Sequence, residues 1–289
     1  MLRRLIGILD MAATEALMST NLHRVAEPSV DMGSGESIKG FHRAGETSLL
    51  PVYQFNARCI HALVPEGGLV VDLGSGSGQF LAYLAEHRPD LSILGVELAH
   101  GMVVRGRQML EERGLARRVQ LVSGDMLDFR KLLEGAPVHL VSSVFSLHHL
   151  PDIEAVRTCI AEIGRAVSEH QAGVWTFDFA RPRRDRTARR FPEVLTPDSS
   201  RTFKVDTVNS LRAAWSWNEL RAALVESIGA NLHSALARGL PLYQVHWSSN
   251  EGGLPPENLW KRCGELPASI QEDAKNLGRL FRNVPGQSG

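Results

Sequence analysis

The middle of the chain alternates between short apolar runs and stretches with helical spacing. Five apolar runs predict β-strands, at residues 68–73, 91–96, 119–122, 138–143 and 174–178. Helical spacing between these runs predicts α-helices near residues 79–87, 101–113 and 153–168. Short apolar strands that alternate with helices imply right-handed crossovers and a parallel sheet that is covered on both faces. The pattern therefore predicts an α/β fold.

After residue 211 the pattern changes. A helix is expected near residues 217–228, and apolar runs at 230–238 and 240–247 follow it around a Gly-Leu-Pro turn. Two strands joined by such a turn form a hairpin. We therefore expect the last strand to run antiparallel to its neighbours.

Both ends of the chain differ from this central region. Residues 1–20 have the spacing of an amphipathic helix, and residues 26–48 are rich in Gly and Ser and predict a lid that crosses a surface. One more helix is expected near residues 267–282. We expect an N-terminal helix with a lid segment, a central domain and a C-terminal extension with one helix, at residues 1–50, 51–249 and 250–289.

The first helix begins like a signal peptide, with two arginines before an apolar stretch. Asp10 and Glu15 interrupt that stretch, and no convincing cleavage site follows. We therefore expect an amphipathic helix that packs against the protein or joins two copies in a homodimer. Attachment to a membrane surface is a less favoured alternative.

Composition narrows the class of protein. Hydrophobic residues make up 43% of the 289 residues and charged residues 22%, as in ordinary globular proteins. Basic and acidic residues both number 32, whereas a protein that holds nucleic acid through its phosphates is expected to be basic. No apolar run approaches the roughly 18 residues that span a bilayer. Three widely spaced cysteines without a CxxC pair disfavour disulfides and structural zinc, so we expect a cytoplasmic protein.

The strongest local signal is the run Val-Val-Asp-Leu-Gly-Ser-Gly-Ser-Gly at residues 70–78. A predicted strand enters a G-x-G-x-G loop, and a helix is expected directly after it. Glycine permits the positive φ angles of a tight turn and lets a ligand approach the backbone, and the helix N-terminus offers free N–H groups. Nucleotide-binding Rossmann-like folds share this pattern, and a purely structural turn is the alternative.

Acidic residues accompany the first three predicted strands. Glu97 ends the second strand, nineteen residues after Gly78, where a carboxylate can bind both ribose hydroxyls. Asp125 follows the third strand and can accept a hydrogen bond from an adenine amine, while Met126 packs on the ring. Asp72 lies beside the loop, where it would repel the pyrophosphate of NAD or FAD. These acids favour a cationic ligand without phosphates, such as S-adenosylmethionine (SAM).

These residues carry a family resemblance that covers roughly residues 50–250. The motifs VVDLGSGSG, GVELAHGMV, SGDML and HLVSSVFSLHHLPD resemble, in order and spacing, those of class I SAM-dependent methyltransferases of the quinone and natural-product type. The resemblance implies a Rossmann-like, seven-stranded sheet in the order 3-2-1-4-5-7-6, with strand seven antiparallel. Carried over by position, it implies the cofactor-binding residues Asp72, Gly74, Ser75, Gly76, Gly78, Glu97, Met102, Asp125, Met126 and Ser143.

Candidate catalytic residues follow the fourth and fifth strands, at the edge where open α/β sheets bind ligands. His148 or His149 could serve as a general base, since imidazole titrates near neutrality, or both could be structural. No metal is expected, because adjacent histidines diverge and no matching acidic cluster is evident. Asp178 could orient a substrate hydroxyl or amine, or it could be a structural acid paired with Arg181.

The acceptor pocket is expected to form from the lid region and from the insert at residues 180–215. Six arginines lie among residues 181–190, which indicates a solvated helix face or a site for an anionic acceptor. The substrate-binding residues we expect are Tyr53, Arg181, Asn209 and Tyr243.

Four function classes are compatible with the glycine loop. A SAM-dependent methyltransferase acting on a small molecule fits best. A nucleic-acid methyltransferase is disfavoured by zero net charge and by Ser-Ser-Val-Phe-Ser at residues 142–146, where an Asn/Asp-Pro-Pro-aromatic motif is expected. A nicotinamide-dependent oxidoreductase is opposed by Asp72 and Asp125. A SAM-binding scaffold without turnover stays open, because no indispensable catalytic residue is visible.

Overall fold

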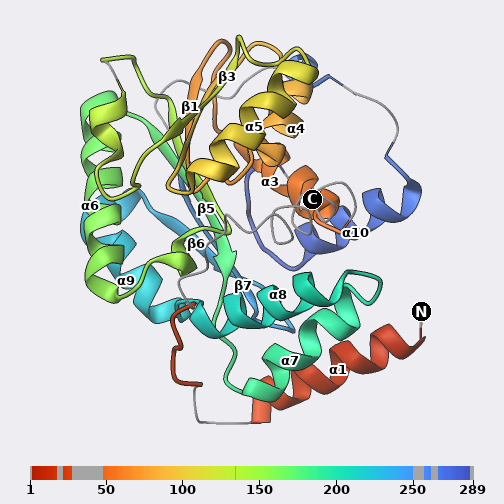
Figure 1. Cartoon of the computed structure of the whole chain (residues 1–289). Coiled ribbons are helices and arrows are strands. Elements are labelled where there is room, and N and C mark those ends of the chain that lie inside the picture. Colours follow the sequence, from red (N-terminus) through yellow and green to blue (C-terminus); the bar gives the residue numbers. More distant parts are fainter. Residues whose placement is uncertain are drawn as a thin grey trace.

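The computed structural model describes residues 2–17, 22–27, 48–133, 135–249, 257–261 and 266–286. One mixed sheet runs through the molecule in the order β3-β2-β1-β4-β5-β7-β6 (Figure 1). Its strands are β1 (Leu69–Leu73), β2 (Ser92–Glu97), β3 (Val119–Ser123), β4 (Leu140–Val144), β5 (Gly173–Phe179), β6 (His233–Leu236) and β7 (Tyr243–Ser248). The first five strands are parallel, and β7 is antiparallel to both β5 and β6. The expected strand order and the antiparallel last strand are confirmed.

Helices cover the sheet on both faces and at one end (Figure 1). In chain order they are α1 (Leu2–Leu17), α3 (Leu50–His61), α4 (Gln79–His87), α5 (His100–Glu112), α6 (Ile153–His170), α7 (Asp185–Leu195), α8 (Arg201–Ala213), α9 (Trp217–Ile228) and α10 (Ala268–Arg279). Helices α6 and α9 lie on one face, and α3, α4, α5 and α10 lie on the other. Helices α1, α7 and α8 lie across the carboxyl end of β5.

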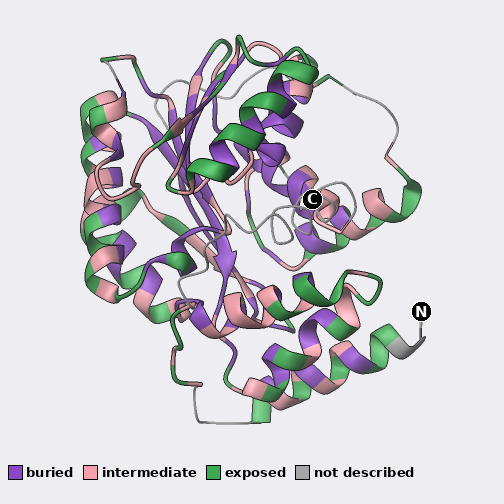
Figure 2. Ribbon diagram, viewed as in Figure 1, coloured by how far each residue is buried: buried purple, intermediate pink, exposed green. Residues whose placement is uncertain are grey.

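The sheet has a hydrophobic core on each face, because successive side chains along a strand point to opposite faces. Val70 of β1 and Trp175 of β5 face the core that contains α3, α4, α5 and α10. The adjacent Val71 and Val174 face the opposite core, with α6 and α9. Both faces of the central strands are therefore buried, as Figure 2 shows. This is why these strands read as unbroken apolar runs rather than as alternating patterns.

Three helices were not predicted from the apolar pattern. Helix α3 begins at Leu50 with Pro51 in its first turn, and α7 and α8 fill the insert after β5. Helix α7 has the sequence DRTARRFPEVL, in which charged residues and Pro192 obscure a short apolar face. That face packs in a third core with α1 and α8. The insert is therefore a pair of helices that caps the sheet edge.

Helix α1 is held on α7 by both apolar and charged contacts. Met11 is buried in the third core, and Asp10 pairs with Arg186 and Arg190 of α7. The opposite side of α1 exposes large apolar side chains, namely Leu5, Ile6, Leu9 and Leu17. No helix in the described part of the chain is long and apolar enough to cross a membrane.

The C-terminal helix belongs to the same core as the sheet. Phe281, just after α10, stacks on Phe55 of α3 with ring centroids 5.5 Å apart, and Leu277 and Val284 join this core. The segment therefore covers α3. The expected lid at residues 26–48 lies outside the described residues except at its two ends.

Candidate active site

Polar groups gather where β1, β2, β4 and β5 end, beginning with the glycine loop after β1. Gly74, Gly76 and Gly78 all have positive φ, between 55° and 71°. A Cβ atom on Gly74 would lie 2.3 Å from the Cβ of Ser146, so this position also requires glycine for close packing. Gly78 is the N-cap of α4. The loop thus turns tightly and leads directly into a helix N-terminus.

Glu97, at the end of β2, holds the glycine loop to the next helix. Its carboxylate accepts hydrogen bonds from the backbone N–H groups of Gly76 and Ala99, both at 2.8 Å. Ala99 is the N-cap of α5. The structure therefore places this acid against the loop, beside the ends of β1 and β2.

Asp72 is a buried acid in β1. The hydroxyl of Ser142 in β4 donates a hydrogen bond to its carboxylate at 2.6 Å. Burial raises the pKa of Asp72 to about 7, aided by the negative charge of Glu97 and opposed by the Ser142 hydrogen bond. A neutral hydroxyl only partly compensates this buried carboxyl group. A cation at this position would stabilise its charged form.

The remaining predicted cofactor residues surround these two acids. Asp125 accepts a hydrogen bond from the N–H of Leu127, and Met126 reaches within 3.2 Å of the Cβ position of Gly74. Ser143 of β4 shares a 2.6 Å hydrogen bond with Ser146, whose hydroxyl donates to the Leu73 carbonyl. Met102 is buried in α5.

His148 and Asp178 form a buried pair at the ends of β4 and β5. The Nδ1 atom of His148 lies 2.6 Å from Oδ1 of Asp178, and the His148 backbone N–H donates to the other carboxylate oxygen at 3.1 Å. Burial lowers the pKa of His148, but the charge and hydrogen bond of Asp178 outweigh it, so the pKa is raised. The alternative that Asp178 pairs with Arg181 is wrong, because its partner is His148.

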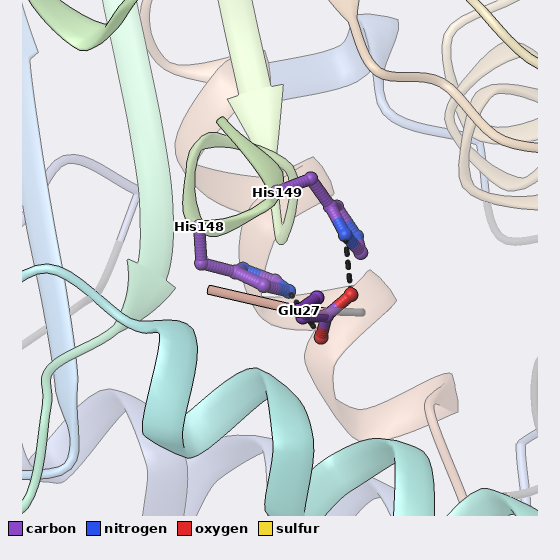
Figure 3. Close-up of side chains that lie close together, drawn as sticks. All are labelled: Glu27, His148 and His149. Carbon is purple, nitrogen blue, oxygen red and sulfur yellow. Dashed lines mark ion pairs between the residues drawn. The ribbon is translucent and has the colours of Figure 1, made fainter. Parts of the chain in front are cut away.

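His149 faces an acid that the sequence analysis did not select. Its Nδ1 atom lies 2.7 Å from Oε2 of Glu27, and Nε2 of His148 lies 3.8 Å from Oε1 of the same residue (Figure 3). The two imidazole rings are 4.3 Å apart between centroids. The expectation that the adjacent histidines diverge is wrong, because the short 3-10 helix Leu147–His149 turns both rings toward Glu27. Glu27 lies 121 positions before His148 in the chain, so no local motif could indicate it.

Residues 22–27 are anchored to the sheet edge mainly by Arg24. Its guanidinium donates hydrogen bonds to the main-chain carbonyls of residues 148, 150, 151 and 213, at 2.5 to 3.1 Å, and lies 3.8 Å from the Trp215 ring centroid. Ser210 of α8 donates to Glu27 at 2.6 Å. Burial raises the pKa of Glu27, but the His149 hydrogen bond and both histidines outweigh it and lower the value to about 2.

The arginine run after β5 is partly paired with acids, from α1, α9 and α7 itself. Arg181 donates to the Ala214 carbonyl and pairs with Glu219 of α9 at 2.9 Å. The Arg183 guanidinium donates to the Glu15 carbonyl of α1 at 2.9 Å. These contacts tie the start of the insert to α1 and α9.

The other expected substrate residues lie apart from one another. Tyr53 packs in the core between Phe80 and Tyr83, and Asn209 lies on α8 next to Ser210. Tyr243 of β7 stacks on Phe179 of β5, with ring centroids 5.5 Å apart.

Phe145, which the sequence analysis did not select, joins this aromatic group. Its ring stacks on that of Phe179 at 4.5 Å. It follows β4 with a φ of 56°, a conformation that costs energy for a residue with a side chain. Backbone strain of this kind is common at functional sites.

Comparisons with known proteins agree with this geometry. Residues 70–170 match the family model of the methyltransferase domain. A demethylmenaquinone methyltransferase from Roseiflexus sp. (strain RS-1) is 29% identical over 197 residues, 62% of this chain and 79% of that one. A tRNA (guanine-N(7)-)-methyltransferase from Oceanobacillus iheyensis is 32% identical over 76 residues, and this match spans only 35% of that enzyme. The solved structure of the plantazolicin methyltransferase BpumL in complex with SAH has a TM-score of 0.56 at 8% identity, covering 84% of this chain and 95% of that one.

Residues 70–170 form a methyltransferase domain, and the sheet has the fold of class I SAM-dependent methyltransferases. The cofactor of this domain is accordingly SAM, and the residues at the sheet edge fit that molecule. Asp72 is a buried carboxylate whose donor is a neutral hydroxyl. The hydroxyl of Ser75, within the loop, is buried without a hydrogen-bond partner among the described residues. An uncompensated acid and an unpaired hydroxyl beside a glycine loop suit a cationic ligand with polar groups.

Proposed function

We propose that this methyltransferase transfers the methyl group of SAM to a small-molecule acceptor bound at the carboxyl ends of β4 and β5. The observation that carries the proposal is a row of buried polar groups on adjacent strands. Asp72 of β1 is bonded to Ser142 of β4, and His148 after β4 is bonded to Asp178 of β5. Cofactor and acceptor groups would therefore lie side by side along this edge.

In this proposal, different residues bind SAM and act on the acceptor. SAM supplies an electrophilic methyl group on a positively charged sulfur. Asp72 stabilises positive charge beside the loop, and Glu97 orients the ribose through its carboxylate. His148, His149 and Asp178 act on the methyl-accepting atom. Helices α7 and α8, which cap the edge, restrict access of water and align the acceptor for in-line displacement.

A small acceptor fits the surroundings of the histidines better than a nucleic acid does. Phe145, Phe179 and Tyr243 supply an aromatic surface beside the polar pair, as a ring-containing acceptor requires. The similarity to a demethylmenaquinone methyltransferase extends over 62% of the chain, whereas that to the tRNA methyltransferase covers 26%. Tyr53, Arg181 and Asn209 stay proposed substrate residues.

The proposal is tested in two steps. SAM and S-adenosylhomocysteine should raise the melting temperature of the protein, and NADH should not. The protein is then incubated with methyl-labelled SAM and a small-molecule extract, and mass spectrometry follows the label. Labelled product below about 1 kDa supports the proposal. Stabilisation by SAM without any labelled product indicates the SAM-binding scaffold, and label on RNA indicates a nucleic-acid substrate.

A further inference from the structure

Among the described residues, Nε2 of His148 has Glu27 as its polar neighbour, at a distance beyond a hydrogen bond. Asp178 accepts hydrogen bonds from the His148 and Phe179 backbone N–H groups, and its Oδ1 lies 2.6 Å from Nδ1 of His148. A carboxylate can only accept, so Nδ1 carries a proton. In the neutral ring Nε2 then presents a lone pair toward Oε1 of Glu27, which is an acceptor. If Nε2 is protonated instead, it forms an ion pair with Glu27 at 3.8 Å, a separation too long for a hydrogen bond.

A metal ion between these groups resolves both difficulties. We propose that Glu27, His148 and His149 bind a divalent transition-metal ion of the zinc type, whose open coordination positions take an oxygen of the methyl acceptor. Their ligand atoms all lie within 4.8 Å of one another, within the described part of the chain. Bonds of about 2.1 Å at a tetrahedral angle separate two ligand atoms by about 3.4 Å. The 3.8 Å separation of Nε2 and Oε1 is close to this value. The 2.7 Å contact of His149 with Oε2 of Glu27 is shorter, so the ion would replace this contact and move the His149 ring outward.

The surroundings have the features of a metal centre. A histidine that donates its second ring nitrogen to a carboxylate, as His148 does to Asp178, is the usual outer partner of a metal-bound histidine. Two imidazoles and one carboxylate are a ligand set for zinc and for other first-row divalent ions, with coordination positions left for substrate. The side chain of His149 is 36% exposed, so an ion can enter from that side.

The charges near the cluster favour a cation. Glu27 and Asp178 flank His148, and Asp206 of α8 lies close enough for the charge of Glu27 to act on it. Among the described residues, the positive group on this side is Arg24, whose guanidinium is engaged with main-chain carbonyls and the Trp215 ring. This arginine anchors the segment that carries Glu27, and its charge acts on Glu27 without a direct ion pair in the described contacts.

The acceptor role of the ion rests on the proposed function, while the binding of the ion does not. A hydroxyl group coordinated to such an ion has a lowered pKa and releases its proton to water. The oxygen lone pair then forms a bond to the methyl carbon as the carbon–sulfur bond breaks, and that electron pair stays on sulfur. The site therefore points to a phenol, enol or alcohol as the acceptor class.

The test measures metal binding by the tag-free full chain after treatment with a chelator. Co²⁺ and Zn²⁺ are titrated by absorption spectroscopy and calorimetry, with His23→Gln as the matched control. His23 lies on the same segment as Glu27 and is exposed. We expect one ion per chain in the wild type and in H23Q, and at least a roughly 100-fold weaker affinity in Glu27→Gln and His149→Gln. Circular dichroism verifies that each variant is folded.

The outcomes separate this inference from the proposed function. Folded wild-type protein that binds no ion, or that binds equally well in E27Q and H149Q, overturns the metal site. If SAM-dependent methyl transfer then continues after chelation, the proposed function stands without the metal. If the ion binds as expected and no acceptor is methylated, the metal site stands and the proposed function fails.

Discussion

Glu97 has a structural task beside the ribose-binding task that we propose for it. Its carboxylate accepts N–H bonds from Gly76 and Ala99, so it joins the glycine loop to α5 before any ribose is bound. Glu97→Ala should weaken SAM binding by about 1–3 kcal/mol, the loss expected when charged hydrogen bonds are removed. Calorimetry measures this, with Glu111→Ala on the exposed side of α5 as the control. Unchanged affinity in E97A would show that SAM does not depend on this acid.

If Asp72 binds the cationic part of SAM as proposed, the affinity for SAM should depend on pH. The pKa of Asp72 is about 7 in the free protein, and a cationic ligand favours the carboxylate, so binding lowers the pKa and releases a proton. The affinity should therefore rise with pH through 7 and be roughly tenfold weaker at pH 6 than at pH 8. Calorimetry at both pH values tests this. Asp72→Asn should bind SAM more weakly, and its affinity should lose this tenfold change. An equal pH dependence in D72N would contradict the assignment.

At the scale of elements, hydrophobic periodicity and local motifs were sufficient to predict most of the sheet. Apolar strands and the helices between them were placed within a few residues, because both faces of the sheet are buried. Helix α7 was missed because its buried face has few apolar residues among its arginines. Glu27 could not be found because only the fold brings it to His149, through the contacts of Arg24 with the end of α8 and with the turn at residues 148–151. Phe145 could not be selected either, because its distinguishing feature is a positive φ angle, which the residue type does not predict.

The β6–β7 hairpin contains a histidine that should make stability sensitive to acid. His246 is fully buried between Ser234 and Gln244, and its ring stacks on Trp217. Burial lowers its pKa to about 3, with a smaller contribution from the charge of Arg221. Below a pH of about 6.5 the unfolded chain takes up a proton at this histidine while the folded chain does not. Stability is therefore present above a pH of about 6.5 and is lost as the pH falls toward 3.

Denaturant unfolding at pH 7.0 and 5.5 measures this effect. His246 should lower the free energy of unfolding by about 1.3 kcal/mol between these values. His246→Gln should lose this part of the decrease, whereas His233→Gln, at an exposed position of the same hairpin, should retain it. If H246Q and wild type lose the same free energy between the two pH values, the buried histidine is not the cause.

At the scale of the whole molecule, the question is whether α1 only packs on the domain or also forms an interface with a second copy. One side of α1 is buried, with Met11 1% exposed in the core with α7 and α8. The other side is exposed, with Leu9 at 59%. Met11→Ala should lower the free energy of unfolding by about 2–4 kcal/mol through the cavity it leaves. Leu9→Ala on the exposed side should change it by no more than about 0.5 kcal/mol in a monomer.

The same pair of variants tests the proposed homodimer through this helix. A dimer that covers Leu5, Ile6 and Leu9 makes the melting temperature depend on protein concentration. L9A should then weaken that dependence and shift the sedimentation coefficient toward the monomer, whereas M11A should lower stability at every concentration. Thermal unfolding and analytical ultracentrifugation over a wide concentration range measure both. A monomeric wild type with a neutral L9A variant would assign α1 to the cap over the proposed active site alone, where Met11 packs with α7 and α8.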